Sequence, residues 1–166
     1  MYKSITIVLL FLGIITVASC EKDDICVDND TPLLVIRFYD QEDTAIVKAV
    51  PSLEVRGINA DTLLGIWEDD EDTFDSIAIP LRVDQGNSTF IFSTNATDDA
   101  TAANIDTVTI SYVAEEIFFS RGCGYIVNYN DLSANTIADD SLWINEIRLV
   151  TPLIENSTSA HVKILH

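Results

Sequence analysis

The sequence predicts an all-β domain, an antiparallel β-sandwich of about eight or nine short strands, which follows an N-terminal signal peptide. Val, Ile, Thr, Phe and Tyr recur in short runs, as is typical of strands. Clusters of Asp, Asn, Gly and Ser separate these runs at intervals that fit turns. The 147 residues after the first 19 contain no internal repeat and suffice for one domain with a buried core. Strands at this spacing favour a sandwich over a closed barrel.

The first strands are predicted from apolar runs near the start of the domain. Residues 33–40, Leu-Leu-Val-Ile-Arg-Phe-Tyr-Asp, form a long apolar stretch, which indicates a central position in a sheet. Residues 47–56 are a second candidate, but Pro51 lacks the backbone N–H that a central strand donates. We therefore expect an edge strand or a bulge there.

A hairpin is predicted between residues 74–82 and 88–94, because the intervening Val-Asp-Gln-Gly-Asn carries turn residues. Residues 106–113 alternate apolar and polar side chains with the period of two of a half-buried strand. Further strands are expected at 116–120, 124–129, 143–150 and 160–165, and residues 131–141 are expected to form a loop or one short helical turn.

The first twenty residues have the pattern of an export signal. Lys3 gives a positive start, and residues 5–15 are almost wholly apolar. This run is too short for a membrane-spanning helix, which needs about 20 residues. Thr-Val-Ala-Ser then precedes Cys20, and the arrangement resembles a lipobox. The resemblance implies cleavage between Ser19 and Cys20 and attachment of lipid to the Cys20 thiol. The alternative is an ordinary signal peptide cut near the same place, which leaves Cys20 as a plain thiol.

These features divide the chain into a signal peptide at 1–19, a lipid anchor and charged tether at 20–30, and a single β-sandwich domain at 31–166. Without the signal, the chain has eight basic residues against 27 acidic ones, a formal charge of −19. A field of this sign repels phosphates, so we exclude nucleic acid as a partner. The expected partner is a membrane, reached through the lipid on Cys20.

The tether begins with Glu-Lys-Asp-Asp at residues 21–24. Lys followed by two acids directly after a lipidated cysteine resembles the surface-export signal of Bacteroidota-type lipoproteins. The resemblance implies an outer-membrane, lipid-anchored protein that faces the medium. The alternatives are a protein that faces the periplasm and a plain solvated spacer.

Two further cysteines, Cys26 and Cys123, remain if Cys20 carries lipid. An even pair in an exported chain favours a disulfide between them. Such a bridge would close a loop of about 98 residues and stabilise the fold by ~4–5 kcal/mol through the entropy of the unfolded chain. Two buried thiols are the alternative. A structural zinc site needs four Cys or His ligands, and the chain adds only His161 and His166, so we expect no metal and no cofactor.

Several short motifs are spread over nearly the whole domain. They are Cys26 ahead of Thr-Pro-Leu at 31–33, Ile-Pro-Leu at 79–81, Asp-Thr-Val-Thr-Ile-Ser-Tyr at 106–112, Phe-Ser-Arg-Gly-Cys-Gly-Tyr at 119–125 and His-Val-Lys-Ile at 161–164. Together they resemble a family of uncharacterised Bacteroidota lipoproteins classed as a domain of unknown function. The resemblance supports a lipoprotein with a β-fold, and it implies no activity and no catalytic residue.

Candidate catalytic residues are scarce. A Ser-His-acid hydrolase needs a base near a strained, exposed serine, but the sequence has no Gly-x-Ser-x-Gly, and we interpret His161 as an ordinary strand residue. We therefore expect a non-catalytic binding or assembly module of the cell envelope, with an envelope protein or glycan as its partner. The alternative is a carbohydrate-active envelope enzyme that uses paired carboxylates, which a chain with 27 acidic residues does not exclude.

Two clusters suggest binding sites. Residues 68–75 are the densest acidic run, and their carboxylates could bind calcium, but the glycine and the terminal glutamate spacing of an EF-hand loop are absent. A solvated loop is the favoured interpretation. Trp67, Tyr125, Tyr129 and Trp143 could form an aromatic platform for sugar rings, although packing in a core or an interface explains them as well.

Asp followed by Ser or Thr and then an apolar residue occurs five times. This pattern resembles the acceptor of Bacteroidota-type periplasmic O-glycosylation, and it implies glycans on exposed copies alone. The candidate acceptors are Thr44, Thr62, Ser76 and Ser141, whereas Thr107 is discounted because it falls within a predicted strand. The alternative is that these dipeptides simply suit turns.

Overall fold

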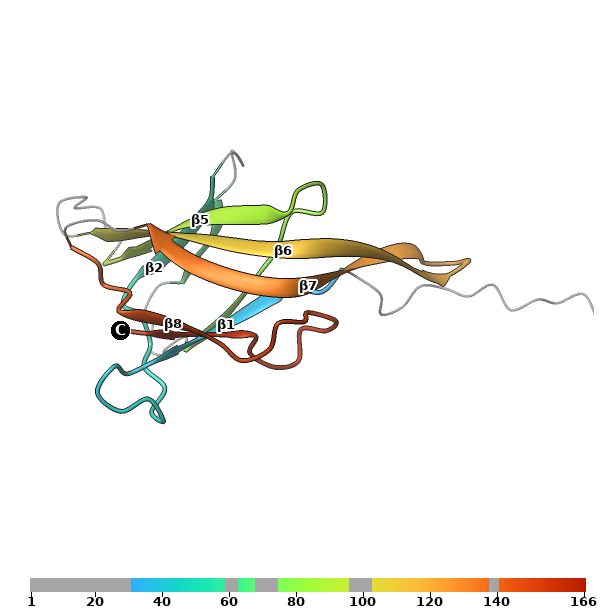
Figure 1. Cartoon of the computed structure of the whole chain (residues 1–166). Helices are drawn as coiled ribbons and strands as arrows, with labels where there is room; N and C mark the ends of the chain where they lie inside the picture. The colour runs from blue at the N-terminus through green and yellow to red at the C-terminus, as the bar shows by residue number, and fades with distance from the viewer. Residues whose placement is uncertain (1–30, 59–62, 68–74, 96–102, 138–140) are drawn as a thin grey trace, which may run out of the picture.

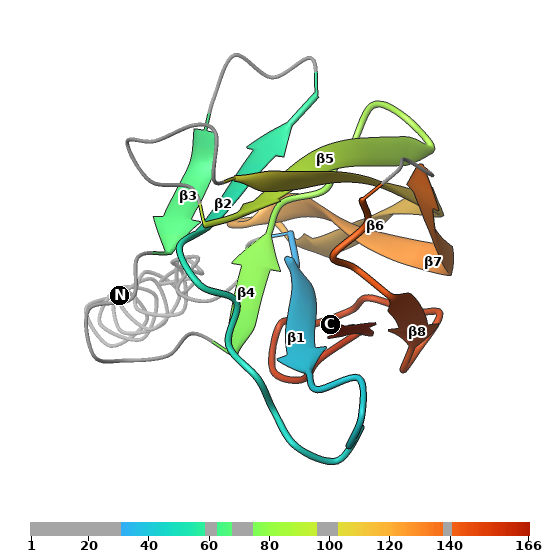
Figure 2. The ribbon, with the colours of Figure 1, turned by 90° about the vertical axis from the view of Figure 1, so that its left-hand side faces the viewer.

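Two β-sheets pack face to face in the computed structural model (Figures 1 and 2), as predicted for a β-sandwich. The structure describes residues 31–58, 63–67, 75–95, 103–137 and 141–166, with the backbone alone at 63–67. The nine strands within these ranges are β1 (Leu34–Tyr39), β2 (Leu53–Gly57), β3 (Leu63–Trp67), β4 (Ser76–Ile79), β5 (Asn87–Thr94), β6 (Asn104–Ser120), β7 (Gly124–Ile137), β8 (Glu146–Leu149) and β9 (Val162–Leu165). Within the same ranges, no helix has the length and apolar composition needed to cross a bilayer.

The smaller sheet has the strand order β4-β1-β9-β8, which places β1 in the interior as its apolar run predicted. β1 pairs with β4 in an antiparallel register but with β9 in a parallel one, Ile36 lying opposite Val162. The expectation of a purely antiparallel sandwich is therefore wrong for this one pair. A tight turn forces neighbouring strands to run antiparallel, and β1 and β9 lie near opposite ends of the sequence with no such turn between them.

The larger sheet has the order β3-β2-β5-β6-β7 and is antiparallel throughout. β2 lies between β3 and β5, so the edge position expected from Pro51 is wrong. Pro51 precedes the strand, and its carbonyl accepts hydrogen bonds from the backbone N–H of Asn95 at 2.8 Å and the Thr94 hydroxyl at 3.1 Å. The proline thus lies in a turn, where its missing N–H removes no ladder hydrogen bond.

The hairpin predicted between residues 74–82 and 88–94 does not form. β4 pairs with β1 in the smaller sheet, whereas β5 pairs with β2 and β6 in the larger one. The connection between them crosses from one sheet to the other, with Leu81 buried on the way. Turn residues between two strands indicate that the chain reverses, but they do not show that the two strands pair. Two strands in opposite sheets can bury their apolar faces in the same core just as well as two strands in one sheet.

β6 and β7 form a long hairpin that projects beyond the sandwich on the right of Figure 1. β6 joins two segments predicted as separate strands, and β7 continues through residues 131–137, where a loop or helical turn was expected. The register shifts between Ser111 and Val113, opposite Asp131, whose φ of 53° is left-handed. Asp tolerates this conformation better than most residues. Asp131, which in the sequence indicated the start of a loop, therefore lies at a bulge within β7.

The core lies between the sheets and takes large side chains from both. Its fully buried members include Leu34, Ile36, Phe38, Leu53, Phe92, Ile110, Tyr129, Ile144, Ile154 and Ile164. Truncating one such aliphatic or aromatic side chain to alanine typically costs about 2–5 kcal/mol of stability. The alternation of apolar side chains along the strands therefore accounts for the sandwich. Candidate functional side chains must be sought in the loops and in the projecting hairpin.

Candidate functional site

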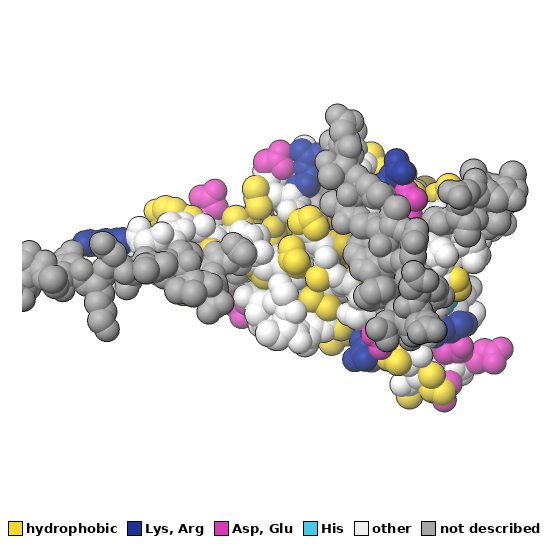
Figure 3. Space-filling view, turned by 180° about the vertical axis from the view of Figure 1, so that it is seen from behind, with side chains coloured by type: hydrophobic (Ala, Val, Ile, Leu, Met, Phe, Trp, Pro, Cys, Tyr) yellow, Lys and Arg dark blue, Asp and Glu magenta, His cyan; other side chains and the backbone are white. Residues whose placement is uncertain are grey.

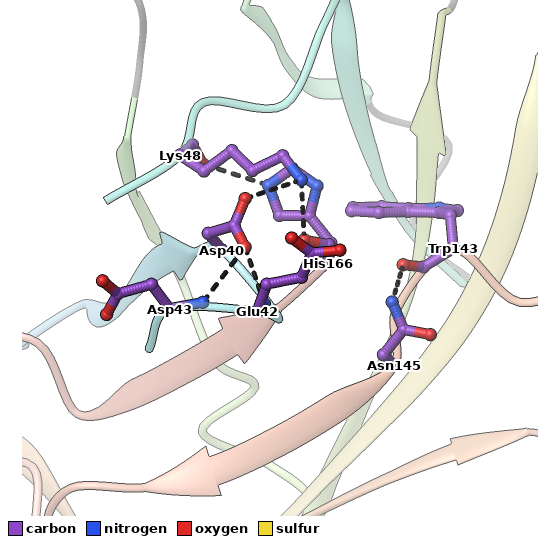
Figure 4. Close-up of polar contacts among 7 residues, drawn as sticks. All are labelled: Asp40, Glu42, Asp43, Lys48, Trp143, Asn145 and His166. Atoms are coloured by element: carbon purple, nitrogen blue, oxygen red, sulfur yellow. Dashed lines mark hydrogen bonds and ion pairs between the residues drawn. The ribbon is translucent and has the colours of Figure 1, made fainter. Parts of the chain in front are cut away.

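A cluster of polar and aromatic side chains surrounds His166, where the segment after β1 meets the end of β9 (Figure 4). The Lys48 ammonium lies 3.2 Å from the Asp40 carboxylate and donates to the His166 carbonyl at 3.0 Å. The His166 ring is in edge contact with Trp143 and Phe38, with ring centroids 5.7 and 6.2 Å away. These contacts bring three separate segments of the chain together.

The titrating groups of this cluster are engaged with the backbone. The Asp40 carboxylate accepts the N–H groups of Glu42 at 2.6 Å and Asp43 at 3.3 Å, and these bonds, with Lys48, lower the pKa of Asp40. Burial lowers the pKa of His166, while its hydrogen bond to the Lys48 carbonyl, at 3.0 Å from Nε2, opposes the shift. Such an arrangement fixes a turn against the sandwich, and we interpret it as structural.

His161 lies immediately before β9 and is buried. Its Nδ1 accepts the backbone N–H of Val35 at 3.0 Å, so this nitrogen carries no proton. Burial lowers the pKa of His161, and a hydrogen bond to the Asn156 carbonyl opposes the shift. Both ring nitrogens thus serve the backbone, so His161 has a structural role, although it precedes β9 and is not the strand residue that was expected.

Asp106 is a buried carboxylate in β6. Its Oδ2 accepts the backbone N–H groups of Trp143 at 3.0 Å and Ile144 at 2.7 Å. The acid thereby holds the segment ahead of β8 against the larger sheet. Charge-assisted hydrogen bonds of this kind are among the stronger ones in proteins, so Asp106 has a clear structural use.

Metal-binding geometry is not found in the part of the chain that the structure describes, where no three His, Cys, Asp or Glu side chains converge. Of the acidic run at 68–75, Asp75 alone lies within that part, and its carboxylate pairs with Arg37 at 3.0 Å. The remainder of the candidate calcium site lies outside the described residues.

The proposed aromatic platform does not assemble from its described members. Tyr129 is fully buried and stacks edge-on against Tyr112 with centroids 5.0 Å apart, whereas Tyr125 is 67% exposed near the end of the hairpin. Trp143 is half-buried beside His166. The side chain of Trp67 lies outside the described part of the structure.

The cysteines expected to define the anchor and the bridge fall in different regions. Cys20 and Cys26 lie outside the described residues. Cys123 lies in the turn between β6 and β7, is half-buried and is disulfide-bonded. Its backbone N–H donates to the Ser120 hydroxyl at 3.1 Å, and Gly124 follows with a φ of 74° that suits glycine.

The candidate glycan acceptors differ in exposure. Thr44 is exposed in a turn whose Asp43 carboxylate accepts the Ala45 N–H at 3.1 Å. Ser141 is also exposed, and its carbonyl accepts the Asn104 amide at 2.7 Å. Ser76 is half-buried at the start of β4, and Thr62 lies outside the described residues.

Comparison with known families identifies the chain. Residues 52–166 match a family of unknown function, DUF6452, over more than half of the sequence. The chain belongs to the DUF6452 family. No curated protein and no solved structure matches it.

The DUF6452 match begins after β1, yet β1 lies between β4 and β9 in the smaller sheet. The folded unit described here therefore includes residues ahead of the matched region. The family supplies no activity, so a function must be argued from the residues themselves.

The feature that sequence reasoning missed is the exposed end of the β6–β7 hairpin. Phe118, Phe119 and Tyr125 are each more than half exposed there, although apolar side chains of this size are usually covered. A signal was present: no Asp or Glu occurs between Glu116 and Asp131 in an otherwise acidic chain. Figure 3 shows apolar side chains on the projecting end of the molecule.

Proposed function

We propose that this chain is a lipid-anchored protein of the cell envelope that acts as a non-catalytic binding or assembly module. The observation that carries the proposal is the sequence Thr-Val-Ala-Ser-Cys at 16–20, which ends an apolar run after a positively charged start. A cysteine at this position is the one that lipidation uses. Residues 21–24 suggest that the protein is carried to the outer membrane and faces the medium.

The start of the folded domain supports a short connection to the anchor. The Thr31 hydroxyl accepts the backbone N–H of Val127 at 3.3 Å, so the domain begins against β7. Five residues from Cys26 to Thr31 span at most about 16–18 Å. The four residues from Val127 back to Cys123 cover about 13 Å of strand. Cys26 is therefore within reach of Cys123, and we propose that it is the disulfide partner because Cys20 is committed to lipid.

The proposal of a non-catalytic role is supported by the contacts of four titratable side chains, which bind backbone groups of the fold. Asp40, Asp106, His161 and His166 each bond to backbone groups that hold connections in place. The exposed apolar side chains of the hairpin are available for contact with a membrane or another molecule, as such patches commonly are. We propose an envelope protein or glycan as the partner, and Thr44 and Ser141 as the acceptors best exposed for a glycan.

The anchor is tested by Cys20→Ala in the full-length chain, with Cys26→Ala as the matched control. Because lipidation requires the Cys20 thiol, we expect the parent and the control to incorporate a fatty-acid analogue and to sediment with membranes. Cys20→Ala should incorporate none and appear as soluble or unprocessed protein. Equal labelling of all three chains would refute the lipobox.

The module is tested by pull-down from detergent-solubilised envelope with the lipidated protein as bait. We expect a defined envelope protein or glycan to be retained by the lipidated bait and not by detergent-treated beads without bait. Turnover of an envelope polysaccharide by the pure protein would contradict the non-catalytic assignment.

A further inference from the structure

The inner face of the β6–β7 hairpin continues beyond the sandwich. Ala114 lies opposite Tyr129 within the core, and the same face next presents Glu116 opposite Val127 and then Phe118 opposite Tyr125. Tyr129 is fully buried, whereas Phe118 is 55% exposed. The face that packs against the core at one end of the hairpin is therefore uncovered at the other end, as its projection in Figure 1 indicates.

The exposed end, residues 117–126, is called here the hairpin tip. The rings of Phe118 and Tyr125 meet edge to face with centroids 5.4 Å apart. Phe119 adds a third ring that is 54% exposed. The paired rings of Phe118 and Tyr125 form an exposed apolar surface, which is the usual mark of a contact with a membrane or another molecule.

The charge of the hairpin tip sets it apart from the rest of the chain. Its single charged side chain is Arg121, whereas the whole chain has 27 acidic and nine basic residues. Acidic surfaces are repelled by anionic headgroups, and an acid-free tip with one arginine is not. The tip itself thus carries no acidic side chain that would repel a lipid phosphate, whereas Glu116, next along the same face, and the rest of the chain are acidic.

The described part of the domain begins beside the hairpin, close to the hairpin tip. Thr31 contacts Val127 in the hairpin, and the eleven residues from Cys20 to Thr31 span at most about 40 Å. Cys123, which lies in the tip, is disulfide-bonded. With Cys26 as its partner, six residues separate the lipid from the tip, a span of about 20 Å at most.

We propose that the hairpin tip seats in the headgroup region of the bilayer that holds the lipid anchor, an inference that rests on the lipidation proposed above. Phe118, Phe119 and Tyr125 enter the interface, where aromatic rings are enriched, and Arg121 meets the phosphates. The lipid holds the protein to the membrane, and the tip orients it. The far end of the sandwich, which carries Ile137 and the His166 cluster, then points away from the bilayer.

The test places a fluorescent reporter at each end of one strand. The full-length lipidated protein is reconstituted into phosphatidylcholine–phosphatidylglycerol vesicles with or without brominated acyl chains, which quench nearby tryptophan. Tyr125→Trp reports on the tip, and Ile137→Trp is the matched control, because both residues are exposed in β7, at 67% and 56%. The parent gives the background from Trp67 and Trp143. We expect quenching of the added tryptophan to be at least about threefold greater in Tyr125→Trp.

Co-flotation with the vesicles separates this inference from the anchor. Vesicle-bound protein with equal quenching of both variants would overturn the seating of the tip and leave the anchor intact. Protein that does not float with the vesicles would overturn both. An emission from Tyr125→Trp that is blue-shifted but not quenched by bromine would assign the tip to a second copy of the chain, and would also overturn the proposal.

Discussion

The carboxylate of Asp106 in β6 accepts the backbone N–H of Ile144 at 2.7 Å, across a sequence separation of 38 residues. The same oxygen accepts the Trp143 N–H at 3.0 Å. Trp143 and Ile144 lie outside the strands, so the Asp106 carboxylate is what holds the connection ahead of β8 against the larger sheet.

Replacing Asp106 should destabilise the fold. Asp106→Ala leaves two N–H groups without their acceptor, and we expect a loss of about 2–4 kcal/mol in the free energy of unfolding. Asp106→Asn keeps an acceptor oxygen and should lose roughly half as much. Urea unfolding followed by circular dichroism measures both. Glu116→Ala, exposed on the same strand, is the control, and an equal loss in that variant would contradict the assignment.

Tyr129 should make the fold sensitive to alkaline pH. Burial raises the pKa of Tyr129 from 10.0 to about 12, and its hydroxyl donates to the Leu81 carbonyl at 3.2 Å. The unfolded chain releases this proton first, so the stabilisation is complete below pH 10 and declines as the pH rises from 10 towards 12. We expect a loss of about 2 kcal/mol over that interval.

The alkaline loss is measured as the difference between the parent and Tyr129→Phe in chemical unfolding at successive pH values. Tyr129→Phe should show a shallower decline, although part remains because burial also raises the pKa of Tyr112. Tyr125→Phe, which removes an exposed tyrosine, should decline like the parent. Identical curves for the parent and Tyr129→Phe would exclude the buried phenol as the cause.

His161 should make the fold sensitive to mild acid. Burial lowers its pKa below the ordinary value of 6.5, and Nδ1 must stay unprotonated to accept the Val35 N–H. The unfolded chain therefore binds the proton more readily, so the stabilisation is complete above pH 6.5 and is lost as the pH falls through the lowered folded pKa. His161→Asn retains an acceptor without this titration, and its stability should change less between pH 7 and 5. A parallel decline of both proteins would assign the acid sensitivity to other groups.

The disulfide should join Cys26 to Cys123. Peptide mapping without reduction should recover the two cysteines in one linked pair, which reduction separates. Cys26→Ser should lower the free energy of unfolding by up to ~4–5 kcal/mol, or less if the native bridge is strained. Cys123 linked to Cys20 would contradict both this pairing and the lipid on Cys20, whereas a free Cys123 thiol would contradict the pairing alone.

The tether should decide which side of the outer membrane the protein faces. Replacing Lys22, Asp23 and Asp24 by alanine should leave the protein lipidated and membrane-bound but protected from protease added to intact cells. The parent should be cleaved under the same conditions, and both should be cleaved after lysis. A parent already resistant on intact cells would place the domain in the periplasm, however well the sequence matches an export signal.

The fold class could be predicted because strand alternation and turn residues depend on local chemistry. The apolar run at residues 33–40 predicted an interior strand, and the position of β1 (Leu34–Tyr39) between β4 and β9 confirms it. Sheet membership could not be predicted, since β4 and β5 present apolar faces that fit either sheet. β3 was missed, and Asp131 marked a bulge where its sequence indicated a turn.

The candidate site was predictable only in part. Cys123 is disulfide-bonded, but Cys26 lies outside the described residues, so the pairing of the two stays a prediction. The structural uses of Asp106 and His161 depend on backbone groups 38 and 126 residues away, which no local pattern indicates. The exposure of Phe118 and Tyr125 follows from where the opposing sheet stops, and this is a property of the assembled fold.

The parallel pairing of β1 with β9 has a consequence for the order in which the protein acquires its shape. β1 cannot pair with β9 until residues 162–165 are available. The hydrogen bond from the Val35 N–H to His161, just before β9, likewise spans 126 positions. Closing so long a loop is slow, and proteins dominated by distant contacts fold slowly. The export proposed above would benefit from this delay, since the chain would stay unfolded until nearly all of it had passed through a translocon.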